Sequence, residues 1–128
     1  MELILQRTII TRDTANGSIT IGGKHICDTA EHTPCMLKPG RYTLTRKKHY
    51  LKCGNGVYKL RKPHIIVGEY RCRGLVIHSH DTYLRVYERL KKAFARGEEV
   101  TLTVEETKKD IRMDVLPALQ DGLEPTTP

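Results

Sequence analysis

The sequence predicts one α+β domain: a mostly antiparallel, barrel-like sheet with one long amphipathic helix at about residues 81–96 and a closing strand at 100–105. Three observations support this class. Short runs that alternate apolar and polar residues recur through the first half of the chain, as in half-buried strands. One later segment carries apolar residues at helical spacing. A further alternating run, residues 100–104, follows that segment directly.

The helix is expected to begin at Thr82, because Asp81 can accept hydrogen bonds from the free amides of a first turn. Gly97 can end it in a left-handed conformation. Its apolar face would carry Tyr83, Tyr87, Leu90 and Phe94, and its opposite, solvated face Arg85, Arg89, Lys92 and Arg96. The apolar run 74–78 predicts a strand before the helix. If that strand neighbours the closing strand, the two run parallel through a right-handed crossover.

The preceding strands are expected at 2–11, 18–21, 24–29, 42–45, 57–60 and 64–67. Asn16-Gly17 predicts the first hairpin turn, and Gly22-Gly23 the second. Pro63 marks a join between strands, since a central strand does not accommodate proline. Residues 108–117 could form a short helical turn. We therefore expect a single domain over residues 1–106 and an acidic, partly disordered tail over 107–128.

Composition bounds the function. With 128 residues, 38% hydrophobic content and no Trp, the chain can fill one core. No stretch has the length of a membrane span or the pattern of a signal peptide, so we expect a cytoplasmic protein without a membrane partner.

The four cysteines, Cys27, Cys35, Cys53 and Cys72, are widely spaced and predict free thiols. Zinc binding by His25, Cys27, His32 and Cys35 is the weaker interpretation, because no tight turn presents a ligand pair. His78, His80 and Asp81 could also hold a metal, but strand and cap roles explain them better. We expect no metal and no cofactor.

Charge is strongly segregated along the chain. Residues 38–73 hold eleven Lys or Arg and one acid, Glu69, whereas residues 98–128 hold eight acids and three basic residues. This separation indicates either a polyanionic partner for the central block or an acidic tail that screens it.

Three motifs carry a family resemblance over most of residues 3–105. They are Thr29-Ala-Glu31, Cys35-Met-Leu-Lys-Pro-Gly-Arg-Tyr42 and Ile77-His78. The chain resembles a divergent member of an uncharacterised family of small bacterial and phage domains, distantly similar to L,D-transpeptidases that remodel peptidoglycan. In that family a Gly-Cys element follows the Ile-His strand. Here it is absent, and Asp81-Thr82 remains.

Without that element, the resemblance does not supply a cysteine nucleophile. The weak catalytic candidates are Cys72 and His78, which could approach each other across a hairpin. A half-buried cysteine and a strand-end histidine are the structural alternative, and we expect no catalytic activity.

The central block favours binding of an anionic polymer. Lys and Arg neutralise phosphates, and interleaved Tyr rings can stack on bases. The candidate contact residues are Arg41, Arg46, Lys47, Lys48, Tyr50, Lys59, Arg61, Lys62, Arg71 and Arg73. The alternative is that these charges only keep a small domain soluble.

The expected function is thus a non-catalytic binding domain whose basic surface contacts nucleic acid or a cell-wall component. A peptidoglycan-processing cysteine enzyme is the first alternative. The second is a structural or accessory phage protein that contacts other phage or host subunits.

Overall fold

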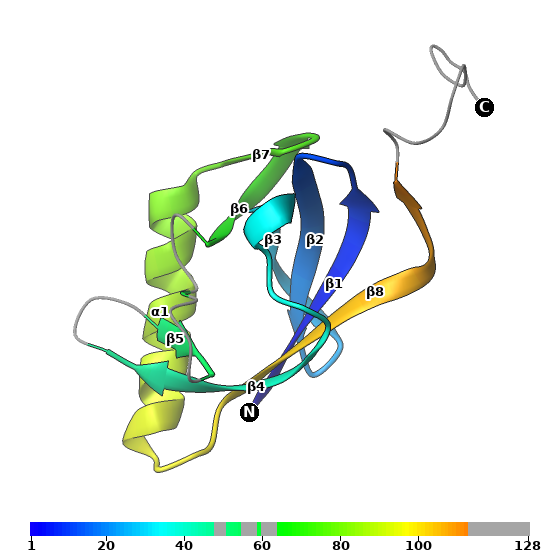
Figure 1. Ribbon diagram of the computed structural model, residues 1–128. Helices are drawn as coiled ribbons and strands as arrows, with labels where there is room; N and C mark the ends of the chain where they lie inside the picture. Colours follow the sequence, from blue (N-terminus) through cyan, green and yellow to red (C-terminus); the bar gives the residue numbers. More distant parts are fainter. Residues whose placement is uncertain (48–50, 55–58, 60–63, 113–128) are drawn as a thin grey trace, which may run out of the picture.

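The computed structural model describes residues 1–47, 51–54, 59 and 64–112, with the backbone alone described over 107–112. These residues form a strongly curled mixed sheet and one long helix (Figure 1). The elements in chain order are β1 (Glu2–Ile10), β2 (Thr14–Ile21), β3 (Lys24–His32), the 3-10 turn η1 (Thr33–Cys35), β4 (Gly40–Arg46), β5 (Leu51–Cys53), β6 (Ile65–Cys72), β7 (Leu75–Ile77), α1 (Ser79–Ala95) and β8 (Thr101–Arg112). The predicted α+β class with a barrel-like sheet is confirmed.

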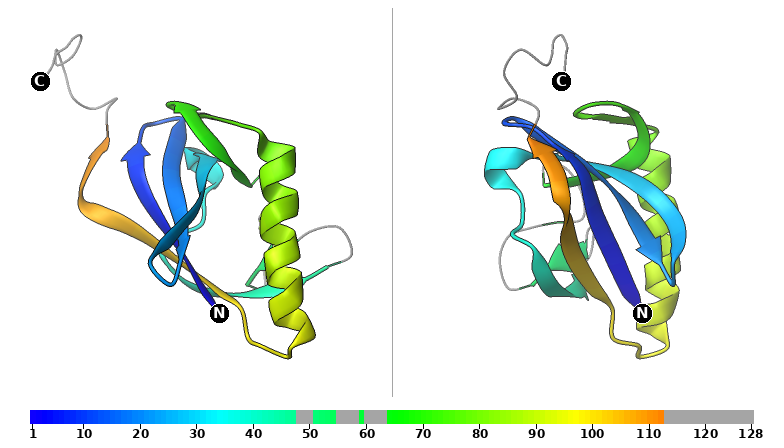
Figure 2. Two further views of the ribbon diagram at one scale, coloured as in Figure 1. Left: turned by 180° about the vertical axis from the view of Figure 1, so that it is seen from behind. Right: turned by 90° about the vertical axis from the view of Figure 1, so that its right-hand side faces the viewer.

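The strand order across the sheet is β5-β4-β8-β1-β2-β3-β6-β7. All neighbours are antiparallel except β1 and β8, which are parallel. The sheet curls into a half-barrel, and α1 lies along its open side in both views of Figure 2. The helix therefore closes the core that the curled sheet leaves uncovered.

The core lies between the concave face of the sheet and α1. Leu3 and Leu5 of β1 and Leu102 and Val104 of β8 are buried there with Leu90 of the helix. The fully buried helix line also includes Val86 and Ala93. The predicted apolar residues Tyr83, Tyr87 and Phe94 are half-buried on one flank of that line. No helix in the described part of the chain is long and apolar enough to cross a lipid bilayer.

The helix begins three residues earlier than predicted. Its first residue is Ser79, and the N-cap position is His78, whose backbone is left-handed with φ 57° and which makes no side-chain cap bond. The predicted capping role of Asp81 is therefore wrong. The left-handed turn at His78 takes the chain from β7 directly into the helix, so Asp81 falls in the first turn. In the first turn, the negative charge of Asp81 interacts favourably with the positive end of the helix dipole.

The predicted Asn16-Gly17 turn is also wrong, because both residues lie inside β2. The turn falls at residues 11–13, where the Thr11 hydroxyl accepts a hydrogen bond from the amide of Thr14 at 3.0 Å. Asn16 is buried and uses its side chain to bond two other segments. Gly17 is required for a close approach: a Cβ there would lie 2.6 Å from the carbonyl oxygen of Gln6.

The closing strand is longer than predicted. β8 continues to Arg112, and its pairing with β1 resumes at Ile9 and Ile111 after a register shift. The helical turn expected at 108–117 is thus wrong for residues 108–112, and the rest of it lies outside the described residues. Strand pairing with β1 overrides the local helical preference.

The strand–helix–strand order is confirmed, but β7 and β8 are not neighbours. β7 pairs with β6 at one edge, while β8 lies between β4 and β1. The helix therefore carries the chain across the open side of the half-barrel.

The remaining predicted strands have two outcomes. The strand expected at 64–67 starts at Ile65 and extends to Cys72. The strand expected at 57–60 lies outside the described residues apart from Lys59, which forms a bridge with Lys52.

Candidate functional site

The first group of predicted contact residues lies at the β4–β5 edge of the sheet. Arg41, Arg46 and Lys47 are exposed and Lys59 is partly exposed; Lys52, which was not among the predicted contact residues, is partly exposed beside Lys59. We call these five residues the basic edge. The chain from residue 32 to residue 68 contains no Asp or Glu, so no carboxylate in that stretch neutralises this surface. Positive charge is therefore concentrated along this part of the chain, while on the β8 side the carboxylate of Glu2 accepts a hydrogen bond from Thr103, the Cα partner of Arg41.

Strand register brings the lysines of this edge together. Thr45 of β4 is the Cα partner of Lys52 on β5, and Lys52 in turn bridges to Lys59. Residues directly opposite each other in an antiparallel pair project to the same side of the sheet, with Cβ atoms about 5 Å apart. Like charges in that arrangement repel each other. Two lysines side by side can contact one anion together, which makes this row the centre of the candidate site.

Arg46 connects the basic edge to the helix. Its Nε donates a hydrogen bond to the Tyr87 hydroxyl at 3.2 Å, and its guanidinium carbon lies 5.9 Å from the centroid of the same ring. The Tyr87 hydroxyl also donates to the carbonyl oxygen of Lys47 at 3.3 Å. These contacts hold the end of β4 against α1, so the cations are presented from a fixed backbone.

The other predicted contact residues do not join this edge. Arg71 and Arg73 are exposed at the β6–β7 hairpin, which forms the opposite edge of the sheet. Arg85 on the helix donates to the carbonyl oxygen of Ile26 on β3 at 3.1 Å, so the helical basic stripe runs along the β3 side, away from Tyr87. The described cations are thus divided between separate surfaces. Lys48, Tyr50, Arg61 and Lys62 lie outside the described residues.

The catalytic candidates lie at different points of one hairpin. Cys72 is the partner of Leu75, whereas Glu69 is the partner of Ile77. His78 follows Ile77, and its Nδ1 lies 3.1 Å from the Glu69 carboxylate. His78 is three residue steps beyond Leu75, a distance of about 10 Å along a strand. Glu69, not Cys72, is the group that contacts His78, and a thiol that distant cannot transfer its proton to the imidazole.

The residues considered as zinc ligands differ in their contacts and in their burial. His25 contacts Asp28 at 2.9 Å, while Cys27 is buried in the core and Cys35 is exposed on η1. Burial raises the pKa of both buried thiols, Cys27 and Cys53, to about 12. Within the described ranges, no three His, Cys, Asp or Glu side chains gather closely enough to hold a metal ion.

Asp28 forms a polar cluster on the outer side of β3. Its carboxylate accepts hydrogen bonds from the Tyr70 amide at 2.9 Å and the Ser18 hydroxyl at 3.4 Å, in addition to its contact with His25. Burial alone would raise the pKa of Asp28, but the hydrogen bonds from Tyr70 and His25 outweigh it and lower that pKa below its ordinary value. The serine faces the carboxylate, not the histidine, so the cluster is not a nucleophilic triad.

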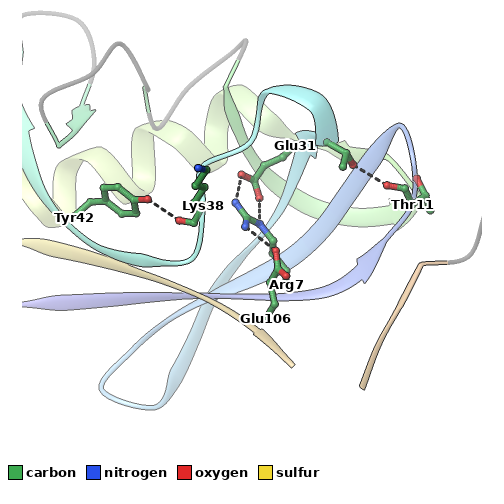
Figure 3. A network of polar contacts seen from close by, with 7 residues as sticks. Arg7, Thr11, Glu31, Lys38, Tyr42 and Glu106 are labelled. Carbon is green, nitrogen blue, oxygen red and sulfur yellow. Dashed lines mark hydrogen bonds and ion pairs between the residues drawn. The ribbon is translucent and has the colours of Figure 1, made fainter. Parts of the chain in front are cut away.

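A buried ionic network was missed at the level of sequence (Figure 3). The Arg7 side chain is fully buried, and its Nε and Nη2 donate to the two carboxylate oxygens of Glu31 at 2.9 and 2.8 Å. Its Nη1 donates to Glu106 at 3.1 Å. Burial alone would lower the pKa of Arg7, but the hydrogen bonds and charges of the two glutamates raise it. The alternation Leu3-Leu5-Arg7 was the signal, because it places Arg7 on the inward face.

This network joins three strands at one end of the half-barrel. Arg7 is the Cα partner of Gly17, and Gly17 is the partner of Thr29. Because Gly17 has no side chain, the guanidinium can pass over β2 to reach Glu31 on β3. Arg7 and Glu31 neutralise each other in the interior, and the second carboxylate, Glu106, is partly exposed to solvent, so we assign the network a structural role.

No family model, curated protein or solved structure matches this chain.

Proposed function

We propose that this chain is a non-catalytic binding domain whose basic edge contacts a phosphate-containing anionic polymer, with single-stranded nucleic acid as the first candidate. The observation that carries the proposal is the cross-strand row of Lys52 and Lys59 at a sheet edge with no carboxylate in the surrounding sequence. Arg41 lies on the same side of β4 as Thr45, the partner of Lys52, and Lys47 follows the end of that strand; Arg46 lies on the other side and contacts Tyr87 of α1.

The shape of the edge supports an extended ligand. Lys52 and Lys59 on adjacent strands are spaced by about 4.8 Å, and Arg41 and Lys47 are six residues apart, about 20 Å along an extended chain. A polymer backbone with regularly spaced phosphates can contact several of them at once. Each neutralised phosphate releases counterions, which is the main source of affinity in sequence-independent binding.

The absence of a Cys72–His78 contact argues for binding over catalysis. A cysteine nucleophile requires a base within hydrogen-bond reach, and His78 contacts Glu69 instead. The proposal therefore needs no reaction, metal or cofactor.

The test is a salt titration of binding to a fluorescent single-stranded 20-mer. The slope of log K against log salt is negative, and the variant Arg41→Gln/Lys47→Gln/Lys52→Gln should reduce its magnitude by about 2, since each phosphate contact on a single strand contributes about −0.7. The matched control is Lys24→Gln/Arg89→Gln/Lys92→Gln, which removes the same charge from exposed positions elsewhere. It should leave the slope nearly unchanged.

Three outcomes separate the alternatives. Equal loss in both triple variants means that net charge, not the basic edge, determines binding. If the 20-mer does not bind but purified anionic cell-wall polymer does, with the same variant sensitivity, the partner belongs to the cell wall. If neither polymer binds at low salt, the basic edge has no polyanion function and the proposal fails.

A further inference from the structure

The β6–β7 hairpin presents an apolar strip at the edge of the sheet. Leu75 and Ile77 are 47% and 37% exposed, although both are large aliphatic residues. They lie two apart on one strand, so they project to the same side, while Val76 between them is buried. β7 is the last strand in the sheet order, and its outer side has no strand partner among the described residues.

Positive charge borders this strip. Arg73 is exposed in the turn of the hairpin, and Arg71 is exposed near the end of β6. Glu69 is the Cα partner of Ile77 and lies on the same side as the strip; its one negative charge, 3.1 Å from His78 Nδ1, is outnumbered by the two arginines. We call Arg71, Arg73, Leu75 and Ile77 the hairpin surface. It suits a ligand that combines apolar side chains with negative charge.

The chain itself carries a segment of that character. Residues 113–124, which lie outside the described residues, contain Asp114, Asp121 and Glu124 and no Lys or Arg. The same twelve residues also contain several aliphatic side chains: Val115, Leu116, Leu119 and Leu123. Most acidic tails lack such a density of apolar residues.

The segment starts close to the hairpin surface. Arg112, the last residue of β8, is the partner of Ile10, and Ile10 is the partner of Ala15. The next residue, Asn16, accepts a hydrogen bond from the amide of Gly74 in the hairpin turn at 2.6 Å. The end of β8 is therefore two strand spacings, about 10 Å, from the strand that contacts the hairpin. Both lie at the same end of the molecule in Figures 1 and 2.

We propose that residues 113–124 dock within the same molecule on the hairpin surface. Twelve extended residues span up to about 40 Å, so the tether is long enough. Leu75 and Ile77 would be covered by aliphatic side chains of the segment, with Arg71 and Arg73 facing its carboxylates. Docking at the β6–β7 edge leaves the β4–β5 edge uncovered. The inference goes beyond the proposed function and does not rest on it.

Hydrogen exchange of the full chain tests this docking. Amides of residues 113–124 should exchange about tenfold more slowly than an unstructured peptide of the same sequence, the ratio that about 1.4 kcal/mol of net docking free energy produces. The variant Leu75→Ser/Ile77→Ser should abolish this protection. The matched control is Leu84→Ser, since Leu84 is 48% exposed on α1 and outside the hairpin surface.

A tail variant guards against a folding artefact. Leu116→Ser/Leu119→Ser alters only residues beyond β8 and should remove protection of the segment, with amides of β1 and β2 unchanged. Unprotected exchange of 113–124 in the unsubstituted chain overturns the proposal. Protection that survives the hairpin substitutions also overturns it. Protection that grows with protein concentration assigns the contact to a second copy and refutes docking within one molecule.

Discussion

Replacing Glu31 by Gln tests how far the buried network stabilises the fold. The substitution removes one charge and keeps the shape of the side chain. Arg7 and Glu31 have side chains 0% and 1% exposed and are joined by two short hydrogen bonds. In Glu31→Gln the guanidinium stays buried, and Glu106 is its remaining ionised partner.

The magnitude follows from burial. Breaking a fully buried ion pair by removing one partner costs about 3–5 kcal/mol. Because Glu106 still bonds Arg7 at 3.1 Å, we expect the lower end for Glu31→Gln, about 3 kcal/mol of unfolding free energy. Glu106 is 22% exposed and Glu31 would remain in place, so Glu106→Gln should cost only about 1 kcal/mol. The double substitution Arg7→Met/Glu31→Leu should lower the unfolding free energy by less than Glu31→Gln does, because it leaves no buried charge without a partner.

Urea denaturation monitored by far-UV circular dichroism measures these differences, provided the slope with denaturant stays constant. The ranking is the prediction: Glu31→Gln is the most destabilised of the three. The reasoning is refuted if Glu106→Gln is as damaging as Glu31→Gln. The reasoning is also refuted if the double variant is the least stable of the three, because an unpaired buried charge would then not be the cause of the destabilisation.

Other predictions concern thiols, acid stability and a close backbone contact. Of the four cysteines, only the exposed thiols of Cys35 and Cys72 should react quickly with a disulfide reagent in the native protein, and all four should react in denaturant. Because the folded-state pKa of Asp28 is depressed, its contribution to stability is present above its unfolded pKa and is lost as the pH falls below about 4. Asp28→Asn should therefore lower the urea midpoint at neutral pH and make that midpoint less dependent on pH below about 4. A midpoint that falls with pH as steeply as in the unsubstituted protein would contradict this. Gly17→Ala should lower the free energy of unfolding by more than about 2 kcal/mol, because the added methyl group would collide with backbone atoms. Gly22→Ala, which has open space around it, should lower it by about 1 kcal/mol because of its positive φ. Equal shifts of the two urea midpoints would show that the contact at Gly17 relaxes without cost.

The sequence pattern was reliable wherever one segment's own periodicity decides its structure. The helical spacing of Tyr83, Tyr87, Leu90 and Phe94 predicted a helix with one buried side, and the structure adds Val86 and Ala93 to that side. The alternation in residues 100–104 likewise required a half-buried strand. These local signals gave the α+β class and the order strand, helix, strand.

The sequence pattern failed where a distant segment competes with a local preference. Asn16 and Gly17 have turn chemistry, yet both lie inside a strand. The Asn16 amide bonds Thr29 and Gly74, and Gly17 allows the Arg7 side chain to cross β2. Neither reason is visible in the residues adjacent to the pair.

What the sequence determined by itself was therefore the type of each main element and the segregation of charge, because both depend only on residues that are close along the chain. Tertiary structure alone decided which cations share a surface. Arg46 and Arg71 belong to one basic block in sequence, but the strand order places them at opposite edges of the sheet. The physical reason is that pairing between β8 and β1, and between β3 and β6, sets these distances, and such contacts join residues that leave no common pattern in the chain.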